Sequence, residues 1–229
     1  MPFVEFLLSG VCHQLASHCL YYGGKPLPLC ARCSGAFVGA TLAMGLLWLL
    51  GEGRRSDLPP WRHAWPLALG AFFWAADGAN SFLHDWGLPH LYMPSNALRL
   101  ITGTGVGLAV GTVLYPAYHY ALWRHVREER VLAEGWHSVA LFAGGAGFVG
   151  LSLAWRSAPR WLALAVNVGS VGVVLSLANA LLAALLIHQR GRAERWIEIV
   201  PYLLLGTLAA VLETGVAALL RAFIEGALG

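Results

Sequence analysis

The four cysteines of this 229-residue chain fall within 22 consecutive positions near its start. Cys30 and Cys33 form a Cys-x-x-Cys pair, and Cys12 with its neighbour His13 lies about 17 residues upstream. Thiolates and imidazoles at such spacings can bind one zinc ion in a tetrahedral arrangement. Residues 21–28 contain the glycines and prolines of a turn that can bring the two arms together. We therefore predict a metal site made by Cys12, Cys30 and Cys33, with His13 as fourth ligand or with a water in the fourth position.

Two alternatives to metal binding stay open for this cysteine cluster. Structural disulfides suit an extracytoplasmic position, because thiols tend to be oxidised there. The Cys-x-x-Cys pair can also serve as a thiol–disulfide exchange centre. We favour metal binding because His13 adjoins Cys12 and because polar residues farther along the chain are expected on the same side of the membrane. Zinc is the metal we expect, with iron, or no metal, as the alternative, and the roles of His18 and Cys19 are left open.

A second group of polar residues lies inside apolar stretches of the chain, where ionisable side chains are costly and therefore informative. The group consists of Asp77, Asn80, Asn96, Arg99, Thr102 and Glu213. We expect these side chains to converge in one half of the bilayer, around a polar cavity open to the outside. Asp77 and Arg99 are the predicted catalytic residues, and the other four are predicted to bind substrate. The alternative is that Asp77 and Arg99 form a buried ion pair that only fixes the bundle.

Membrane helices are the elements that must position these residues. Hydrophobic residues make up 58% of the chain and charged residues 12%, whereas a soluble domain usually carries about 25% charged residues. Six apolar runs are each long enough to cross roughly 30 Å of hydrocarbon. They cover residues 34–51, 64–83, 97–121, 137–155, 161–187 and 199–221. The predicted fold is all-α, a polytopic bundle of about six transmembrane helices.

Basic residues indicate how this bundle is oriented. Nine arginines follow the first, third and fifth runs, and five basic residues lie on the other side. The positive-inside rule therefore places both termini and the cysteine cluster outside the cytoplasm, in a multi-pass protein of the cell (inner) membrane. No basic block or aromatic-spaced basic face suggests binding of nucleic acid.

Glycines are dense in the predicted spans. Gly103, Gly107 and Gly111 line one face of the third run at four-residue spacing, and four more crowd residues 144–150. Small residues at this spacing let helices approach closely. We interpret all of them as packing positions in a compact bundle.

The chain divides into two parts. Residues 1–33 are predicted to form an interfacial or re-entrant Cys/His-rich segment, with a short helix over residues 3–22 acting as a lid on the outer mouth. Residues 34–229 form the bundle, in which residues 34–121 carry most of the site. The start of the chain lacks the basic region and cleavage site of a secretory signal, so we expect it to be mature.

Three stretches of the chain resemble a known family. They are Cys12-His13-Gln14, the run from Pro26 through Cys30-Ala31-Arg32-Cys33-Ser34-Gly35, and the later set Asp77, Asn96, Arg99, Thr102 and Gly103. Over roughly residues 10–111 the chain resembles the uncharacterised bacterial and archaeal membrane proteins filed under domain of unknown function 2085. In that family a proline and an Arg-Ser usually follow Cys-His-Gln, whereas Ala16, His18 and Cys19 stand near those places here. The resemblance brings no established reaction with it, so it supports the site and leaves the chemistry open.

The main functional hypothesis is an integral membrane metalloprotein. We expect it to act as a metal-dependent enzyme on a lipid or small amphiphile in the non-cytoplasmic leaflet, although the sequence leaves enzymatic activity undecided. One alternative is a thiol–disulfide oxidoreductase in which Cys30 and Cys33 pass electrons between a membrane quinone and external thiols. Another is a transporter or scaffold without enzymatic activity, held by structural disulfides. The lipid bilayer is the expected partner, and a homo-oligomer is left open.

Overall fold

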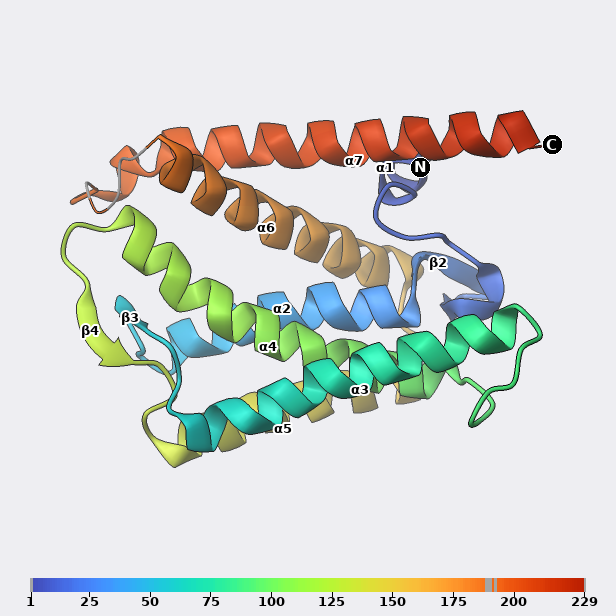
Figure 1. Cartoon of the computed structure of the whole chain (residues 1–229), viewed down its shortest axis with the longest axis horizontal. Helices are drawn as coiled ribbons and strands as arrows, with labels where there is room; N and C mark the ends of the chain where they lie inside the picture. The colour runs from blue at the N-terminus through green and yellow to red at the C-terminus, as the bar shows by residue number, and fades with distance from the viewer. Residues whose placement is uncertain (1, 188–190, 192, 229) are drawn as a thin grey trace.

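Six long helices, running roughly side by side, form the body of the molecule in the computed structural model, which describes residues 2–187, 191 and 193–228 (Figure 1). They are α2 (Ala31–Leu49), α3 (Trp61–Asp85), α4 (Asn96–Leu122), α5 (Gly135–Ala154), α6 (Arg160–Leu186) and α7 (Val200–Leu228). Each predicted span coincides with one of these helices, and most ends agree within three residues. The exception is α7, which continues beyond the predicted end at residue 221 to Leu228.

Five of the helices are long and apolar enough to cross a membrane, namely α2, α4, α5, α6 and the helical stretch Trp196–Ala227 that contains η2 (Trp196–Glu198) and α7. Among the described residues, α3 does not meet the same hydropathy requirement although it has 25 residues. Its buried polar residues Asp77, Asn80 and Ser81 interrupt the apolar run. The all-α polytopic bundle is confirmed, with α3 as its most polar long helix.

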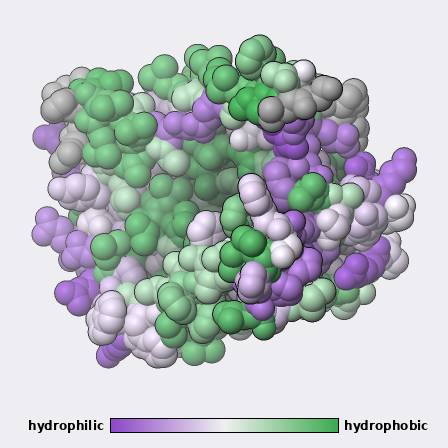
Figure 2. Space-filling view, turned by 45° about the vertical axis from the view of Figure 1, so that its right-hand side comes forward, coloured by the Kyte–Doolittle hydropathy of each residue, from purple (hydrophilic) through white to green (hydrophobic). Residues whose placement is uncertain are grey.

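The outer surface of the bundle is largely apolar. Side chains such as Phe72 on α3 and Leu204 on α7 are more than 60% exposed. Figure 2 shows apolar side chains over much of the visible face, with hydrophilic ones gathered toward its left and right sides. An apolar surface of this extent is suited to lipid rather than to water, and the hydrophilic sides correspond to the two ends of the bundle.

Glycines allow α2 and α4 to pack backbone against backbone. A Cβ on Gly103 would lie 2.2 Å from the carbonyl oxygen of Arg32, and one on Gly107 would lie 2.4 Å from that of Ala36. These glycines confirm the predicted close approach. The prediction was wrong for Gly147 and Gly150, because nothing lies within 4 Å of the positions where their Cβ atoms would be. The glycines of α4 therefore position the first helix of the site, whereas those of α5 do not all serve packing.

The segment before α2 differs from the expected helix. A short helix α1 (Pro2–Leu8) and a 3-10 turn η1 (Ala16–His18) are followed by an antiparallel hairpin of β1 (Cys19–Tyr22) and β2 (Lys25–Cys30). The predicted helix over residues 3–22 is therefore wrong beyond Leu8. Gly23 and Gly24 both have positive φ, which is what a tight two-residue hairpin turn requires. This turn places Cys19 opposite Cys30.

The opposite end of the bundle is closed by a short parallel pair of strands, β3 (Arg55–Asp57) and β4 (Arg127–Arg130) (Figure 1). Glu52, in the loop before β3, is fully buried there. Its carboxylate accepts a hydrogen bond from the backbone N–H of Leu132 at 3.1 Å, and it contacts the side chains of Arg55 and His137. Glu52 thus ties the end of α2 to the start of α5.

Candidate metal centre

Three cysteine side chains meet where the N-terminal loop, β2 and α2 come together. The Sγ atoms of Cys12, Cys30 and Cys33 all lie within 4.8 Å of one another. Cys12 and Cys30 are buried, Cys33 is half-buried, and all three are free thiols. Apolar side chains of α1, β2 and α6 surround them, including Leu8, Leu29 and Val171. The predicted convergence of the two cysteine arms is therefore present in the fold.

Two backbone amides donate hydrogen bonds to these sulfurs. The N–H of Cys30 donates to Cys12 Sγ at 3.2 Å, and the N–H of Cys33 donates to Cys30 Sγ at 3.4 Å. Cys30 is the N-cap of α2, so its sulfur also lies at the positive end of the helix dipole. Hydrogen bonds with Cys30 and Cys33 hold the pKa of the Cys12 thiol below its usual range, while hydrogen bonding to Cys12 raises the pKa of the Cys30 thiol. The cluster therefore favours a thiolate, which is the form that binds metal ions.

Arg221 of α7 holds the loop that carries Cys12. Its guanidinium donates hydrogen bonds to the carbonyl oxygens of Cys12 and His13, each at 2.8 Å. In the sequence, Arg221 is only one of the basic residues expected on the outer side. Its role in holding the Cys12 loop could not be predicted, because its partners are backbone carbonyls 208 and 209 residues away.

His13, the expected fourth ligand, does not join the three thiols in the described structure. Its Nε2 lies 3.2 Å from Nδ1 of His18, and the two rings pack edge to face. His18 in turn lies 3.3 Å from the carboxylate of Asp85, and burial lowers the pKa of its imidazole. Cys12 and His13 lie in an irregular loop, in which the Cys12 side chain is buried and the His13 side chain is exposed.

Cys19 also stays outside the three-thiol group. Its Sγ donates a hydrogen bond to the carbonyl oxygen of Leu15 at 3.1 Å. Burial raises the pKa of the Cys19 thiol to about 12, so this side chain remains protonated. Cys19 is therefore the natural internal control for the three clustered cysteines.

Asp77 binds Arg32, one of the two residues between the cysteines of the Cys-x-x-Cys pair. Its carboxylate forms an ion pair with Arg32, whose Nε donates to Oδ2 at 3.2 Å. The hydroxyl of Tyr92 donates to Oδ1 at 3.0 Å, and the hydroxyl of Thr102 lies 3.4 Å from Oδ2. Asp77 is only 1% exposed. The alternative pairing of Asp77 with Arg99 is wrong, because Arg32 takes that place.

The remaining predicted site residues of α3 and α4 contact the protein itself. Asn80 accepts a hydrogen bond from the N–H of Leu91 at 2.8 Å and donates to the carbonyl of Tyr92 at 2.9 Å. Asn96 donates to the carbonyls of Ser17 and Cys19 at 3.0 and 3.1 Å. These two asparagines thus hold the loop after α3 and the start of the hairpin.

Arg99 completes this arrangement by donating to the Asn96 side-chain oxygen at 3.0 Å. Its Nε is buried without a hydrogen-bond partner among the described residues. Glu213 does not belong to the group. It accepts a hydrogen bond from Asn179 of α6 at 2.9 Å, and α7 lies on the side of the bundle away from α3 (Figure 1). Among the six polar residues, Asp77 contacts Thr102 and Asn96 contacts Arg99, whereas Asn80 and Glu213 bind other parts of the chain.

A cavity of about 160 Å³ lies between the hairpin, α2, α5 and α6, and the three clustered cysteines do not line it. Its walls are mostly apolar, with Phe148 and Trp155 among them. Ser34, which follows Cys33, and Asn167 also line it. The Ser34 hydroxyl and the Asn167 side-chain oxygen are buried without hydrogen-bond partners among the described residues. Such a cavity can take a small polar group attached to an apolar body.

Comparison with known proteins agrees with the membrane fold. The family described as Predicted membrane protein (DUF2085) matches residues 12–113, which include the three clustered cysteines and the Asp77 contacts. An uncharacterized protein of Methanocaldococcus jannaschii is 25% identical over 116 residues, covering 51% of this chain and 69% of the relative. No solved structure matches the chain. The resemblance seen in the sequence is thus confirmed, and over residues 12–113 the chain matches the predicted membrane proteins of the DUF2085 family.

Proposed function

We propose that this membrane protein binds a thiolate-accepting metal ion through Cys12, Cys30 and Cys33, with zinc as the first candidate and iron as the second. The observation that carries the proposal is the approach of three sulfur atoms to within 4.8 Å of one another. Tetrahedral zinc with Zn–S bonds of about 2.3 Å places sulfurs roughly 3.8 Å apart. A small inward movement of the side chains is therefore enough to reach that geometry.

The number and surroundings of the sulfurs also support a metal. A disulfide uses two cysteines and leaves the third as a buried thiol, whereas a metal uses all three. The N–H groups of Cys30 and Cys33 donate to sulfur, which stabilises the negative charge that a thiolate brings to the site. Three protein ligands are also the number in catalytic zinc sites, where water or substrate takes the fourth position. The number of protein ligands therefore favours a metal-dependent enzyme over a purely structural metal site.

Asp77 is best placed as a positioning residue in this proposal. It binds Arg32, and Arg32 lies in the first turn of α2 between the two cysteine ligands. Its other contacts, to Tyr92 and Thr102, fix the carboxylate on α3. The acid/base role of Asp77 and the substrate-binding role of Arg99 stay predictions. A lipid or small amphiphile is the proposed substrate class, supported by the apolar cavity that Ser34 and Asn167 line.

The proposed location of the centre is the outer side of the cell membrane. Six arginines that support this orientation lie in β3, in β4, in the adjoining loops or in the first turn of α3: Arg54, Arg55, Arg62, Arg124, Arg127 and Arg130. The hairpin with the cysteines lies toward the other end of the bundle (Figure 1). Because basic loops are retained in the cytoplasm, the cysteine end is expected outside.

One observation favours a second candidate function, thiol–disulfide exchange. The N–H of Cys33 donates to Cys30 Sγ at the start of α2, and a helix N-terminus stabilises the thiolate of such a Cys-x-x-Cys pair. In that case Cys30 and Cys33 would form a reversible disulfide, and Cys12 would not be required for it.

Metal content and thiol reactivity of the same sample test the two functions against each other. The full chain is purified in mild detergent without chelator, and zinc and iron are measured by elemental analysis. We expect about one metal ion per chain, with three thiols that react only after chelation. Cys12→Ser, Cys30→Ser and Cys33→Ser should each lose the metal, whereas the control Cys19→Ser should keep it. Absence of metal, with two thiols that appear only after reduction, would instead establish the disulfide.

A further inference from the structure

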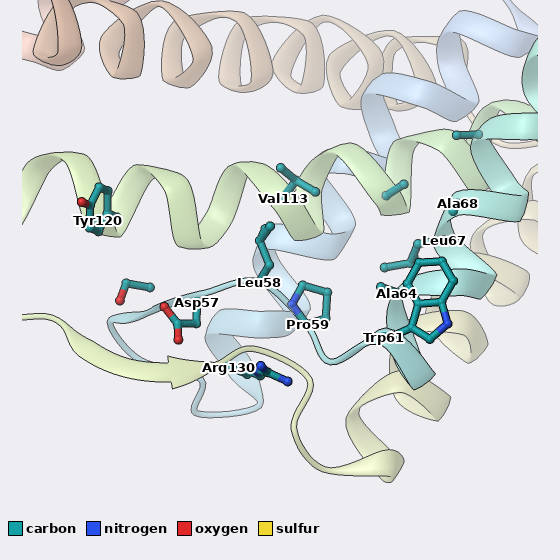
Figure 3. Close-up of a pocket in the computed structure, with 13 residues that line it drawn as sticks. Asp57, Leu58, Pro59, Trp61, Ala64, Leu67, Ala68, Val113, Tyr120 and Arg130 are labelled. Carbon is teal, nitrogen blue, oxygen red and sulfur yellow. The ribbon is translucent and has the colours of Figure 1, made fainter.

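A second and larger hollow lies at the end of the bundle with β3 and β4, away from the cysteines. This groove between α3 and α4 has a volume of about 870 Å³ (Figure 3). One end is apolar, lined by Leu67 and Ala68 of α3 and Val113 of α4. Asp57 and Arg130, from the two short strands, line the other end. The groove therefore combines an apolar channel with a charged mouth.

The shape of the groove follows from how α3 and α4 cross. At Gly70 the helices touch, since a Cβ there would lie 2.9 Å from the carbonyl oxygen of Gly105. From this contact they diverge toward β3 (Figure 1). Ala64, Ala68 and Ala71 face the widening gap at helical spacing, and their methyl groups are too short to fill it. The result is a wedge that is closed at the glycine contact and open toward the loops.

The charged mouth carries one group of each sign. Asp57 and Arg130 are paired residues of the parallel strands, yet within the described part of the chain neither side chain forms an ion pair or a hydrogen bond. Two neighbouring arginines, in contrast, form ion pairs. Arg55 binds Glu52 and Glu129, and Arg127 also binds Glu129. Asp57 and Arg130 are therefore free to bind a molecule that carries both charges.

We propose that this groove binds a phospholipid with a zwitterionic headgroup that contains a primary ammonium. Its acyl chain would lie along the alanines of α3 and Val113, which is about 50% exposed on the lipid-facing surface. Arg130 would bind the phosphate, and Asp57 would accept hydrogen bonds from the ammonium.

The charge pattern selects this headgroup over two others. A purely anionic phospholipid would meet the Asp57 carboxylate as well as Arg130, and like charges repel. A choline headgroup carries the same positive charge as an ammonium but has no N–H to donate. The loops at this end place the mouth at the level of lipid headgroups, where such a lipid enters sideways from the bilayer. The proposal does not depend on a metal at the cysteines.

Lipid retention by the full chain tests the proposal. The protein is reconstituted in bilayers with equal amounts of phosphatidylethanolamine, phosphatidylcholine and phosphatidylglycerol, extracted in mild detergent, and the lipids retained per chain are measured by mass spectrometry. We expect phosphatidylethanolamine to be retained preferentially. Arg130→Gln should lower its retention by about tenfold, the effect of losing one charge-assisted hydrogen bond. Asp57→Asn should abolish the preference for phosphatidylethanolamine over phosphatidylglycerol.

Matched variants separate the groove from general lipid binding. Arg124→Gln and Glu128→Gln remove single exposed charges from the same end and should leave retention unchanged. Ala68→Trp, or the milder Ala64→Leu, fills the groove and should prevent retention, while an unchanged unfolding temperature shows that the fold is intact. Equal retention of the three lipids by the original chain would overturn the proposal. So would a preference for phosphatidylglycerol, or retention that survives both groove-filling variants.

Discussion

Asp77 at the hairpin end and Glu52 at the opposite end are both buried and both bound by an arginine, but they join different parts of the chain. Asp77 connects α3 to the Cys-x-x-Cys turn through Arg32, 45 residues away. Glu52 takes its arginine from three residues along and reaches the start of α5 through Leu132 and His137. The first carboxylate supports a candidate ligand set, and the second only closes a loop. Burial of a charge therefore does not by itself distinguish a functional site from a structural one.

The two ends also differ in how completely their polar groups are paired. At the hairpin end Asn80 binds a backbone carbonyl of the loop after α3, and Asn96 and Arg221 bind backbone carbonyls beside the cysteines. At the opposite end Asp57 and Arg130 have no such partners in the described chain, and a wide groove opens beside them. These polar side chains of the hairpin end thus hold its own loops in place, whereas, within the described residues, Asp57 and Arg130 at the other end are free beside a wide groove.

Asp77→Asn should have the largest effect on stability. It leaves the half-buried Arg32 guanidinium without its counter-charge, and removal of one partner from a buried ion pair costs about 3–5 kcal/mol. Thermal unfolding in detergent measures the change. The double variant Arg32→Met with Asp77→Leu should recover most of the loss, because no unpaired charge remains. If Asp77→Asn keeps its stability and its metal but loses an activity, Asp77 is catalytic rather than positioning.

Glu52→Gln should have a somewhat smaller effect, about 2–3 kcal/mol. Arg55 retains its second partner Glu129, and the amide oxygen of glutamine can still accept from the N–H of Leu132. The same unfolding measurement applies, together with the metal content, which should not change. A loss of metal in this variant would show that the two ends of the bundle are coupled rather than independent.

Gly103→Ala should cost about 1–3 kcal/mol, because its Cβ would force α2 and α4 apart at Arg32. Gly147→Ala in α5 is the matched control, since its Cβ meets nothing within 4 Å. We expect the control to be neutral or slightly stabilising, as alanine favours a helix. Equal unfolding temperatures for the two variants would contradict the close packing of α2 on α4.

Arg221→Gln should weaken metal binding by about tenfold with little change in helix content. The loss of its hydrogen bonds to the carbonyls of Cys12 and His13 frees the loop, so Cys12 is less well placed. Competition with a chelator of known affinity measures the effect, and circular dichroism checks the helices. Arg124→Gln, which removes a surface ion pair at the other end, is the control.

Mild acid should have the smallest of these effects, a local loss of stability in the hairpin. Burial keeps the pKa of His18 below its usual 6.5, so the folded protein holds this imidazole neutral. The unfolded chain gains the proton first as the pH falls through 6.5, and the contribution of His18 to stability is then lost. Amide hydrogen exchange in the hairpin should therefore quicken as the pH falls from 7 to 5, after correction for the intrinsic pH dependence of exchange. His18→Gln should remove this change.

Particular residues show why some predictions succeeded and others did not. Cys12, Cys30 and Cys33 were found because cysteines are rare in this chain and their spacing is typical of a shared ligand set. Asp77 stood out because a carboxylate is costly inside an apolar run. Glu52 gave no such signal, since it follows the run in a stretch that resembles any exposed loop. The alternative ion pair of Asp77 with Arg99 is wrong, because sequence spacing does not tell which way Arg32 points.

The amino-acid sequence by itself determined the helices of this protein and the close helix approach that the glycines of α4 allow. Those features depend on local properties, namely the length of each apolar run and the absence of side chains at glycines three and four residues apart. Only the tertiary structure decided that His13 turns to His18, that Asp77 binds Arg32, and that a groove opens between α3 and α4. These outcomes depend on how helices are rotated and crossed, and that is set by contacts between residues far apart in the chain.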